Sequence, residues 1–87
     1  MRTLFHQKIK DYIRCQLLTT RRTMDVSQDN MASILGMSTR SYTKLESGEN
    51  CCNLVTFILF LRYCCPDINA FISELFELID EVANSAA

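Results

Sequence analysis

Residues 26–48, VSQDNMASILGMSTRSYTKLESG, decide the fold because they contain two short helical patterns separated by a tight turn. Ser27 and Ser38 stand just before the two patterns, where a serine hydroxyl can accept a hydrogen bond from a free N–H of the first turn. Gly36 ends the first pattern, since glycine adopts the positive φ of a helix-terminating turn without steric strain. The stretch therefore predicts two capped helices joined by a glycine turn.

Apolar side chains recur in both patterns at helical spacing, and they define the side of each helix that faces the core. The first helix, expected at residues 27–35, carries an apolar stripe with a small residue between its larger members: Met31, Ala32, Ile34 and Leu35. The second helix, expected at residues 39–46, is anchored by Tyr42 and Leu45. Its polar positions lie together on the outside: Thr39, Arg40, Thr43 and Lys44. Together the two patterns predict a helix-turn-helix unit.

One spacing pattern runs through the whole stretch, and it is formed by Val26, Ser27, Gln28, Met31, Ala32, Leu35, Gly36, Met37, Ser38, Tyr42, Leu45, Glu46 and Gly48. With these residues the stretch resembles the lambda-repressor-like (Cro/Xre-type) helix-turn-helix DNA-binding family. The resemblance extends less strictly over residues 9–72. Asp25 departs from it, because relatives have glycine there, but aspartate tolerates the left-handed conformation better than most residues. The resemblance implies an all-α, five-helix domain whose helices 2 and 3 form the helix-turn-helix.

The rest of the chain predicts three further helices around this unit, all in one domain. Apolar residues recur on one face over residues 3–24: Phe5, Ile9, Ile13, Leu17, Thr20 and Met24. Residues 54–64 are apolar nearly all round, so we expect that helix to be buried on more than one side, one against the core of the chain and another against a partner subunit, with Asn53 as its N-cap. After Pro66, residues 67–83 predict a last helix with a wide apolar stripe: Ile68, Phe71, Ile72, Leu75, Phe76, Ile79 and Val82.

Charge is distributed unevenly along the chain. The net charge of −1 by itself argues against a nucleic-acid-binding protein. However, residues 1–65 hold all nine Lys and Arg against five Asp and Glu, whereas residues 66–87 hold five acids and no base. This asymmetry suits a DNA-binding body with a C-terminal segment that faces away from DNA, although an ordinary solvated helix face explains the acids as well.

The five cysteines are expected to be reduced thiols in or near the core, with a redox role as the alternative. Two pairs are directly adjacent, at 51–52 and 64–65, which does not fit the spacing of a zinc site. No apolar run reaches the roughly 18 residues of a membrane span. Charged residues also interrupt the N-terminus where a signal peptide needs an apolar run, so a cytoplasmic location is the default expectation.

The resemblance implies that the protein binds double-stranded DNA and regulates transcription, more commonly by repression. Base edges in the major groove would be read by Thr39, Arg40, Thr43 and Lys44. Arg40 is the best of these, because its fork can bind guanine O6 and N7 together. Phosphates would be contacted by Gln28, Ser38 and Ser41, although Ser38 is as readily only a cap. For each residue the alternative is a solvated polar side chain.

The resemblance also implies an ion pair between Arg21 and Glu46 that fixes the angle between the first and third helices. Glu49 departs from the family, because relatives often place a basic residue there and a carboxylate would repel phosphate. One histidine, no nucleophile elbow and no phosphate-binding glycine loop argue against an enzyme, and no cofactor is expected.

A chain this short buries only about 60% of its unfolded surface, so dimerisation would help it to fold. We expect a homodimer through the helix at 54–64, the helix at 67–83 or the N-terminal part of the first helix. Two recognition helices would then meet successive major grooves about 34–36 Å apart. The alternative is a non-catalytic protein-interaction module, such as an antitoxin or adaptor, whose last two helices hold a partner around Phe71 and Leu75. A small-ligand pocket between those helices is a further alternative to a plain apolar core.

Overall fold

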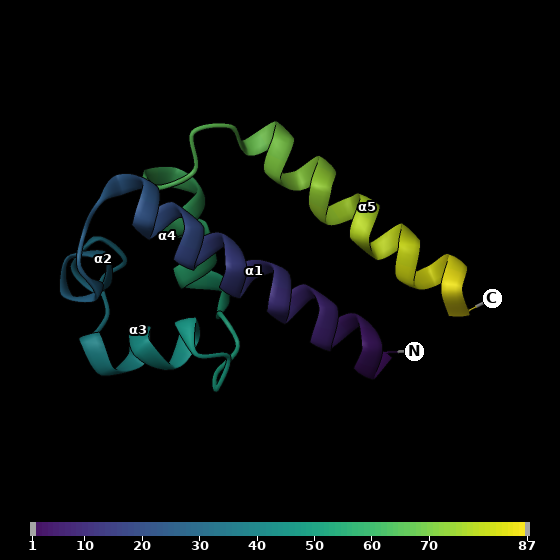
Figure 1. The fold of residues 1–87 in the computed structure, drawn as a ribbon, viewed down its shortest axis with the longest axis horizontal. Coiled ribbons are helices and arrows are strands. Elements are labelled where there is room, and N and C mark those ends of the chain that lie inside the picture. The colour runs from purple at the N-terminus through teal and green to yellow at the C-terminus, as the bar shows by residue number, and fades with distance from the viewer. Residues whose placement is uncertain (1, 87) are drawn as a thin grey trace.

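In a computed structural model, the described residues 2–86 form five α-helices and contain no strand (Figure 1). The helices are α1 (Arg2–Met24), α2 (Gln28–Ile34), α3 (Thr39–Glu46), α4 (Leu54–Tyr63) and α5 (Ile68–Ala86). The predicted all-helical class and the presence of five helices are confirmed. Their ends lie within three residues of the expected positions, and the largest difference is at the end of α5.

Side-chain caps begin the three central helices. Ser27, Ser38 and Asn53 accept hydrogen bonds from the backbone N–H groups of Asn30, Ser41 and Thr56, at 3.1, 3.1 and 2.8 Å. Each bond satisfies a donor that the helix itself leaves free. The starts of these helices are therefore set by local sequence.

Left-handed residues end the first three helices. Asp25 has a φ of 56°, Gly36 of 68° and Gly48 of 83°. Gly48 is needed for a second reason, because a Cβ there would lie 3.1 Å from Cδ of Arg14. The absence of a side chain thus lets an arginine of α1 lie over the end of α3.

Helix α1 connects the two parts of the molecule, since it packs against both α5 and α3, while α2 and α3 pack against each other. In Figure 1, α1 and α5 run antiparallel and bring the two chain ends to the same side, and α2, α3 and α4 gather around the other end of α1. The result is an elongated body of 42 × 26 × 20 Å.

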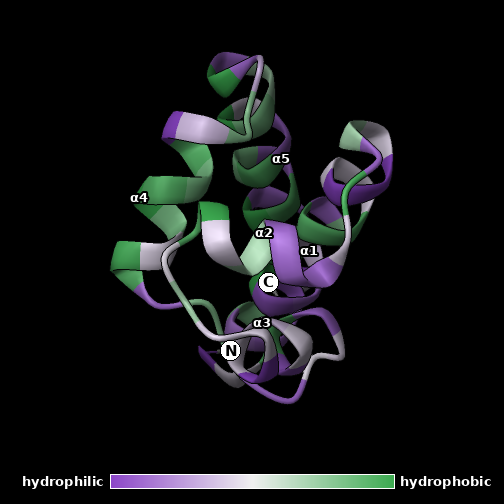
Figure 2. Cartoon of the chain, turned by 90° about the vertical axis from the view of Figure 1, so that its left-hand side faces the viewer, coloured by the Kyte–Doolittle hydropathy of each residue, from purple (hydrophilic) through white to green (hydrophobic). Residues whose placement is uncertain are grey.

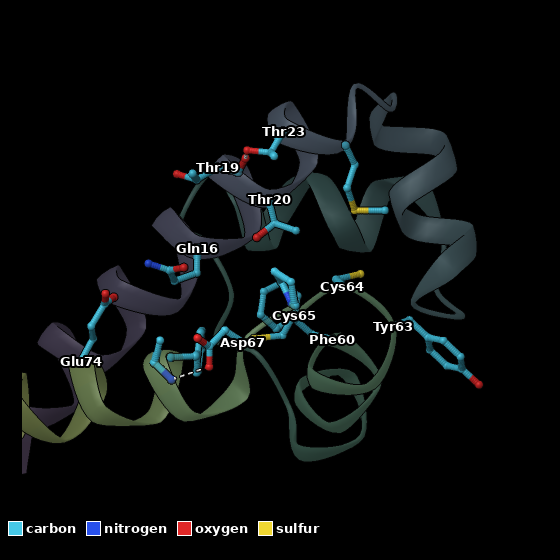
Figure 3. Close-up of a pocket in the computed structure, with 14 residues that line it drawn as sticks. Gln16, Thr19, Thr20, Thr23, Phe60, Tyr63, Cys64, Cys65, Asp67 and Glu74 are labelled. Atoms are coloured by element: carbon cyan, nitrogen blue, oxygen red, sulfur yellow. Dashed lines mark hydrogen bonds between the residues drawn. The ribbon is translucent and has the colours of Figure 1, made fainter.

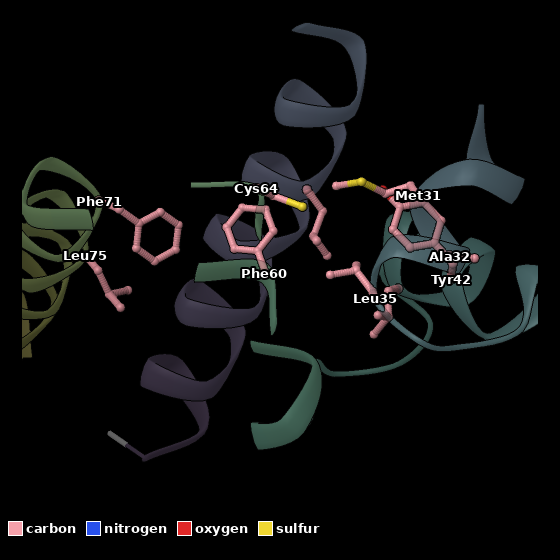
Figure 4. Packing of buried hydrophobic residues seen from close by; sticks show 10 residues of the cluster. Met31, Ala32, Leu35, Tyr42, Phe60, Cys64, Phe71 and Leu75 are labelled. Carbon is pink, nitrogen blue, oxygen red and sulfur yellow. The ribbon is translucent and has the colours of Figure 1, made fainter. Parts of the chain in front are cut away.

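The core runs along α1 and is formed by Leu17, Met31, Ala32, Leu35, Tyr42, Leu45, Phe60, Cys64, Phe71 and Leu75 (Figure 4). Phe71 is its aromatic centre on the α5 side. The centroid of its ring lies 5.3 Å from that of Tyr12, 5.9 Å from that of Phe57 and 5.8 Å from that of Phe60. Tilted pairs at these distances are favourable, so this side chain links α5 to both α1 and α4.

Within the single chain, α4 is buried on one side only, and its other side, expected to meet a partner subunit, is exposed. Leu54, Val55 and Ile58 expose 73%, 69% and 53% of their surface, and the apolar colour of α4 reaches the outside in Figure 2. The apolar stripe of α5 is likewise only partly covered, because Ile68 and Phe76 are exposed. In both cases the apolar stripe is wider than the neighbouring helices cover.

All five cysteines are free thiols. Cys64 is buried, and Cys52 and Cys65 are half-buried, but Cys15 and Cys51 are exposed, contrary to the expected burial. Burial and the neighbouring Cys51 raise the pKa of Cys52 to about 11, which keeps that thiol protonated and unreactive. Within residues 2–86, no group of three or more potential metal ligands gathers and no helix is long and apolar enough to cross a membrane.

Candidate nucleic-acid interface

Helix α3 has one buried face and one polar outer face. Tyr42, Leu45 and Glu46 are buried against the rest of the molecule. The outer face carries the residues predicted to read bases: Thr39, Arg40 and Thr43 are exposed and Lys44 is half-buried. These positions fall together because residues three and four apart share one side of a helix. The outer face of α3 can therefore reach a molecule that approaches from outside.

Arg21 of α1 holds the C-terminal end of α3 through a two-point ion pair. Its Nε lies 2.6 Å from Oε2 of Glu46, and its Nη2 lies 3.0 Å from Oε1 of the same carboxylate. A third donor, Nη1, reaches the backbone carbonyl of Val26 at 3.1 Å. The expected pair is thus present, and it also fixes the segment that leads into α2.

Glu46 is a mostly buried carboxylate whose side chain exposes only 7% of its surface. Burial alone would raise its pKa, but the hydrogen bond from Arg21, the neighbouring hydroxyl of Tyr42 and the hydrogen bond from Gln28 together lower the pKa below its ordinary value. Glu46 is therefore ionised at neutral pH. The hydroxyl of Tyr42 is close enough to interact with this charge, and among the described residues it has no hydrogen-bond partner.

Gln28, the predicted phosphate ligand, lies inside this network. Its Nε2 donates to Oε1 of Glu46 at 3.2 Å, and its Oε1 accepts from the hydroxyl of Thr43 at 3.2 Å. The amide therefore joins the start of α2 to the middle of α3. The second proton of the Nε2 amide group is not used by these bonds, so Gln28 can donate to a phosphate while it keeps both of them.

The two predicted threonines of α3 are also tied to their surroundings. Thr39 donates to the carboxylate of Asp29 on α2. The single hydroxyl proton of Thr43 is shared between two acceptors, the backbone carbonyl of Thr39 at 2.9 Å and Oε1 of Gln28 at 3.2 Å. Of the predicted base readers, Arg40 and Lys44 thus carry the positive charge of the outer face, while the threonine hydroxyls serve the contact between α2 and α3.

Sequence reasoning missed Asp29. Its carboxylate lies beside the N-terminal end of α3, where a negative charge is favoured by the helix dipole. No spacing signal could identify this contact, because it depends on how α2 and α3 cross. Asp29 and Glu49 are both exposed, so one carboxylate lies beside the beginning of α3 and another lies shortly after its end.

Ser38 and Ser41 form a local pair at the start of α3. Oγ of Ser38 accepts from the backbone N–H of Ser41 at 3.1 Å and donates to Oγ of Ser41 at 3.0 Å. Ser38 is thus an N-cap in this structure. Both side chains are exposed, so Ser41 remains accessible at the same end of α3 as Arg40.

No family model matches the chain, and no curated protein or solved structure is significantly similar to it. The structure fixes α3 against the rest of the molecule and leaves Arg40 and Lys44 on its outer face. Gln28 and Asp29 of α2 accept hydrogen bonds from the threonines of α3. This arrangement holds α3 in a fixed orientation, from which two cationic side chains can reach an anionic or base-lined groove.

Proposed function

We propose that the protein is a sequence-specific, double-stranded DNA-binding transcriptional regulator that reads the major groove with α3. The supporting observation is that α3 is fixed by buried residues on one side and carries Arg40 and Lys44 on the other. An α-helix fits the major groove of B-DNA, where each base pair presents a distinct set of donors and acceptors. In this proposal α2 and α3 are the helix-turn-helix of a lambda-repressor-like domain.

Arg40 carries most of the sequence preference in this proposal. Its exposed guanidinium can donate two parallel bonds to guanine O6 and N7, worth roughly 1–3 kcal/mol of discrimination. Lys44 lies one turn further along the same face and adds a second cationic contact. The hydroxyl protons of Thr39 and Thr43 are used in internal hydrogen bonds, so these side chains can accept from a base but cannot donate to one without losing them. We therefore assign them a smaller share of the preference.

Phosphate contacts come from the beginnings of the two helices. Ser41 lies in the first turn of α3, and Gln28 is the first residue of α2, where backbone N–H groups point outward. Asp29 and Glu49 oppose phosphate at the edges of the same surface. We therefore expect modest non-specific affinity and a shallow salt dependence, since the slope grows by about 0.9 per neutralised phosphate.

The first experiment is a selection from random duplexes, followed by fluorescence anisotropy titration of an enriched duplex at two salt concentrations. We expect Arg40→Ala to relax the preference at one base position and Gln28→Ala to weaken all duplexes alike. The control is Lys8→Ala, an exposed lysine in the N-terminal half of α1.

If no duplex binds at low salt, the proposal is refuted. An equal loss of affinity for all sequences on Arg40→Ala would remove the base-reading role of that side chain. If Lys8→Ala weakens binding as much as Arg40→Ala does, attraction is only general and α3 has no special part in it.

A second candidate function is a protein-interaction module of the same fold, and the exposed apolar face of α4 favours it. Phe71 and Leu75, the residues expected to hold a partner, are buried in the core, so a charge there would unfold the protein. The informative change is Ile58→Glu on the exposed face. An interaction module would lose its partner on Ile58→Glu and keep full function on Arg40→Ala.

A further inference from the structure

A cleft of about 480 Å³ lies between the C-terminal half of α1 and the junction of α4 with α5 (Figure 3). Its volume falls within the range of small-molecule sites, roughly 300–1,000 Å³. One wall is a polar face of α1 that includes Gln16 and Thr20, and the other is the start of α5. The buried rings of Phe60 and Phe71 lie at its base.

The charged residues that line this cleft are all acidic. Asp67 and Glu74 line it, and none of its lining residues is a lysine or an arginine. Asp67 caps the start of α5 and Glu74 lies two turns further along the same side, about 10 Å away along the axis. Ala70 and Phe71 lie between them on that face, so an apolar strip separates the two carboxylates.

Each carboxylate already has one structural bond and keeps capacity for more. Oδ1 of Asp67 accepts from the backbone N–H of Ala70 at 3.0 Å, and Oε2 of Glu74 accepts from the hydroxyl of Tyr12 at 3.1 Å. These bonds hold the two side chains in place. An ionised carboxylate has about four lone-pair positions, so both groups can accept further bonds from a ligand.

We propose that this cleft binds a small linear diamine, with one ammonium group at Asp67, the other at Glu74 and the alkyl chain across Ala70 and Phe71. The two carboxylates supply charge complementarity, and the apolar strip between them matches methylene groups. Gln16 and Thr20 on the opposite wall offer oxygen atoms for the remaining ammonium protons. Anions are rejected because no cation lines the cleft. This binding activity is separate from recognition of DNA and does not depend on it.

The test is isothermal titration calorimetry of the full chain with α,ω-diaminooctane, without DNA. We expect saturable one-to-one binding. Octylamine, which has one ammonium group, should bind more weakly, and octanoate should not bind. No saturable binding at millimolar diamine would overturn the proposal, and so would equal affinity for diaminooctane and octylamine or measurable affinity for octanoate.

Two isosteric variants separate charge from folding. Asp67→Asn keeps a capping oxygen for α5, and Glu74→Gln keeps an acceptor for Tyr12, so both should fold. Each should weaken diamine binding about two- to fivefold, as expected for an exposed ion pair. Glu77→Gln, an exposed acid of α5 outside the cleft, is the matched control and should leave the affinity unchanged.

The double variant Asp67→Asn/Glu74→Gln gives the decisive comparison. If its affinity equals that of the unmodified chain, the diamine does not use these carboxylates and the proposal is wrong. If Glu77→Gln weakens binding as much as Glu74→Gln does, the attraction comes from the general acidity of α5 and the cleft is not the site.

Discussion

At the scale of single residues, Glu46 shows how far sequence and structure agree. Its pairing with Arg21 is implied by the resemblance, and the structure contains it. The bonds from Gln28 to Glu46 and from Thr43 to Gln28 could not be predicted. Periodicity shows which side of a helix a residue occupies, but the partner of a long polar side chain depends on how two helices approach each other.

The lowered pKa of Glu46 predicts a pH-dependent contribution to stability. Because the folded-state pKa lies below the ordinary value of 4.5, this contribution is present above pH 4.5 and is lost as the pH falls through the folded-state pKa. We expect Glu46→Gln to lower the free energy of unfolding by about 1–2 kcal/mol at pH 7. Urea denaturation from pH 7 to pH 3 measures the difference from the unmodified chain, which should shrink with acidification.

A difference that stays constant over this pH range would show that the charge of Glu46 does not stabilise the fold. The exposed Glu77 provides the control, and Glu77→Gln should change the free energy of unfolding by less than about 0.5 kcal/mol at either pH.

The turn between α2 and α3 gives a second prediction at this scale. Gly36 has a φ of 68°, but a Cβ there would be 4.0 Å from Leu59, which is an ordinary contact. Gly36→Ala should therefore cost only backbone strain, about 1–2 kcal/mol. Gly36→Asn should cost less, since asparagine visits this conformation more readily. Equal losses for the two variants in urea denaturation would point to steric crowding in place of strain.

At the scale of elements, α2 and α3 could be predicted almost completely. Ser27, Gly36 and Ser38 are local signals, because a cap or a left-handed turn depends only on neighbouring residues. The uncovered faces of α4 and α5 could not be predicted in the same way. Whether Ile58 or Phe76 is buried is decided by helices distant in the sequence, and the apolar pattern is the same in either case.

The carboxylates at the edges of α3 predict a specific change in DNA affinity, which rests on the proposed function. Asp29→Asn keeps an acceptor for Thr39 while removing one negative charge, and Glu49→Gln removes another. We expect each variant to bind any duplex about two- to threefold more tightly at low salt, with unchanged preference among sequences, because phosphate is less strongly repelled. Anisotropy titrations at two salt concentrations measure this gain.

The same titrations with Asp80→Asn, an exposed acid on the second half of α5, separate local from general effects. An equal gain for Asp80→Asn would mean that net charge alone sets the affinity. Unchanged affinity for both Asp29→Asn and Glu49→Gln would mean that phosphates do not approach this surface.

At the scale of the whole molecule, α1 joins two parts with different chemistry. Its C-terminal half positions α3 through Arg21, and the same half forms one wall of the cleft with Gln16 and Thr20. The uneven charge of the sequence corresponds to this division, because the five acids of the C-terminal segment lie in α5 or at the residue just before it. The cleft itself has no signature in the sequence, since it is formed where three helices fail to fill the space between them.

The exposed face of α4 predicts that two copies of the chain associate there. Leu54, Val55 and Ile58 are largely exposed, and Arg62 is the single charged residue of α4, so two such faces can meet without strong repulsion. We expect sedimentation equilibrium to show a homodimer at micromolar concentration. Ile58→Glu should yield a monomer with unchanged helical circular dichroism, and its melting temperature should no longer rise with protein concentration.

Phe76→Glu is the matched variant on α5, where the phenylalanine is also exposed. It should leave the dimer intact if α4 forms the interface. Dissociation by Phe76→Glu but not by Ile58→Glu would place the interface on α5. A monomeric unmodified chain at high micromolar concentration would exclude both interfaces. In that case each chain presents a single α3, and a bound DNA site would span one major groove without a repeated half-site.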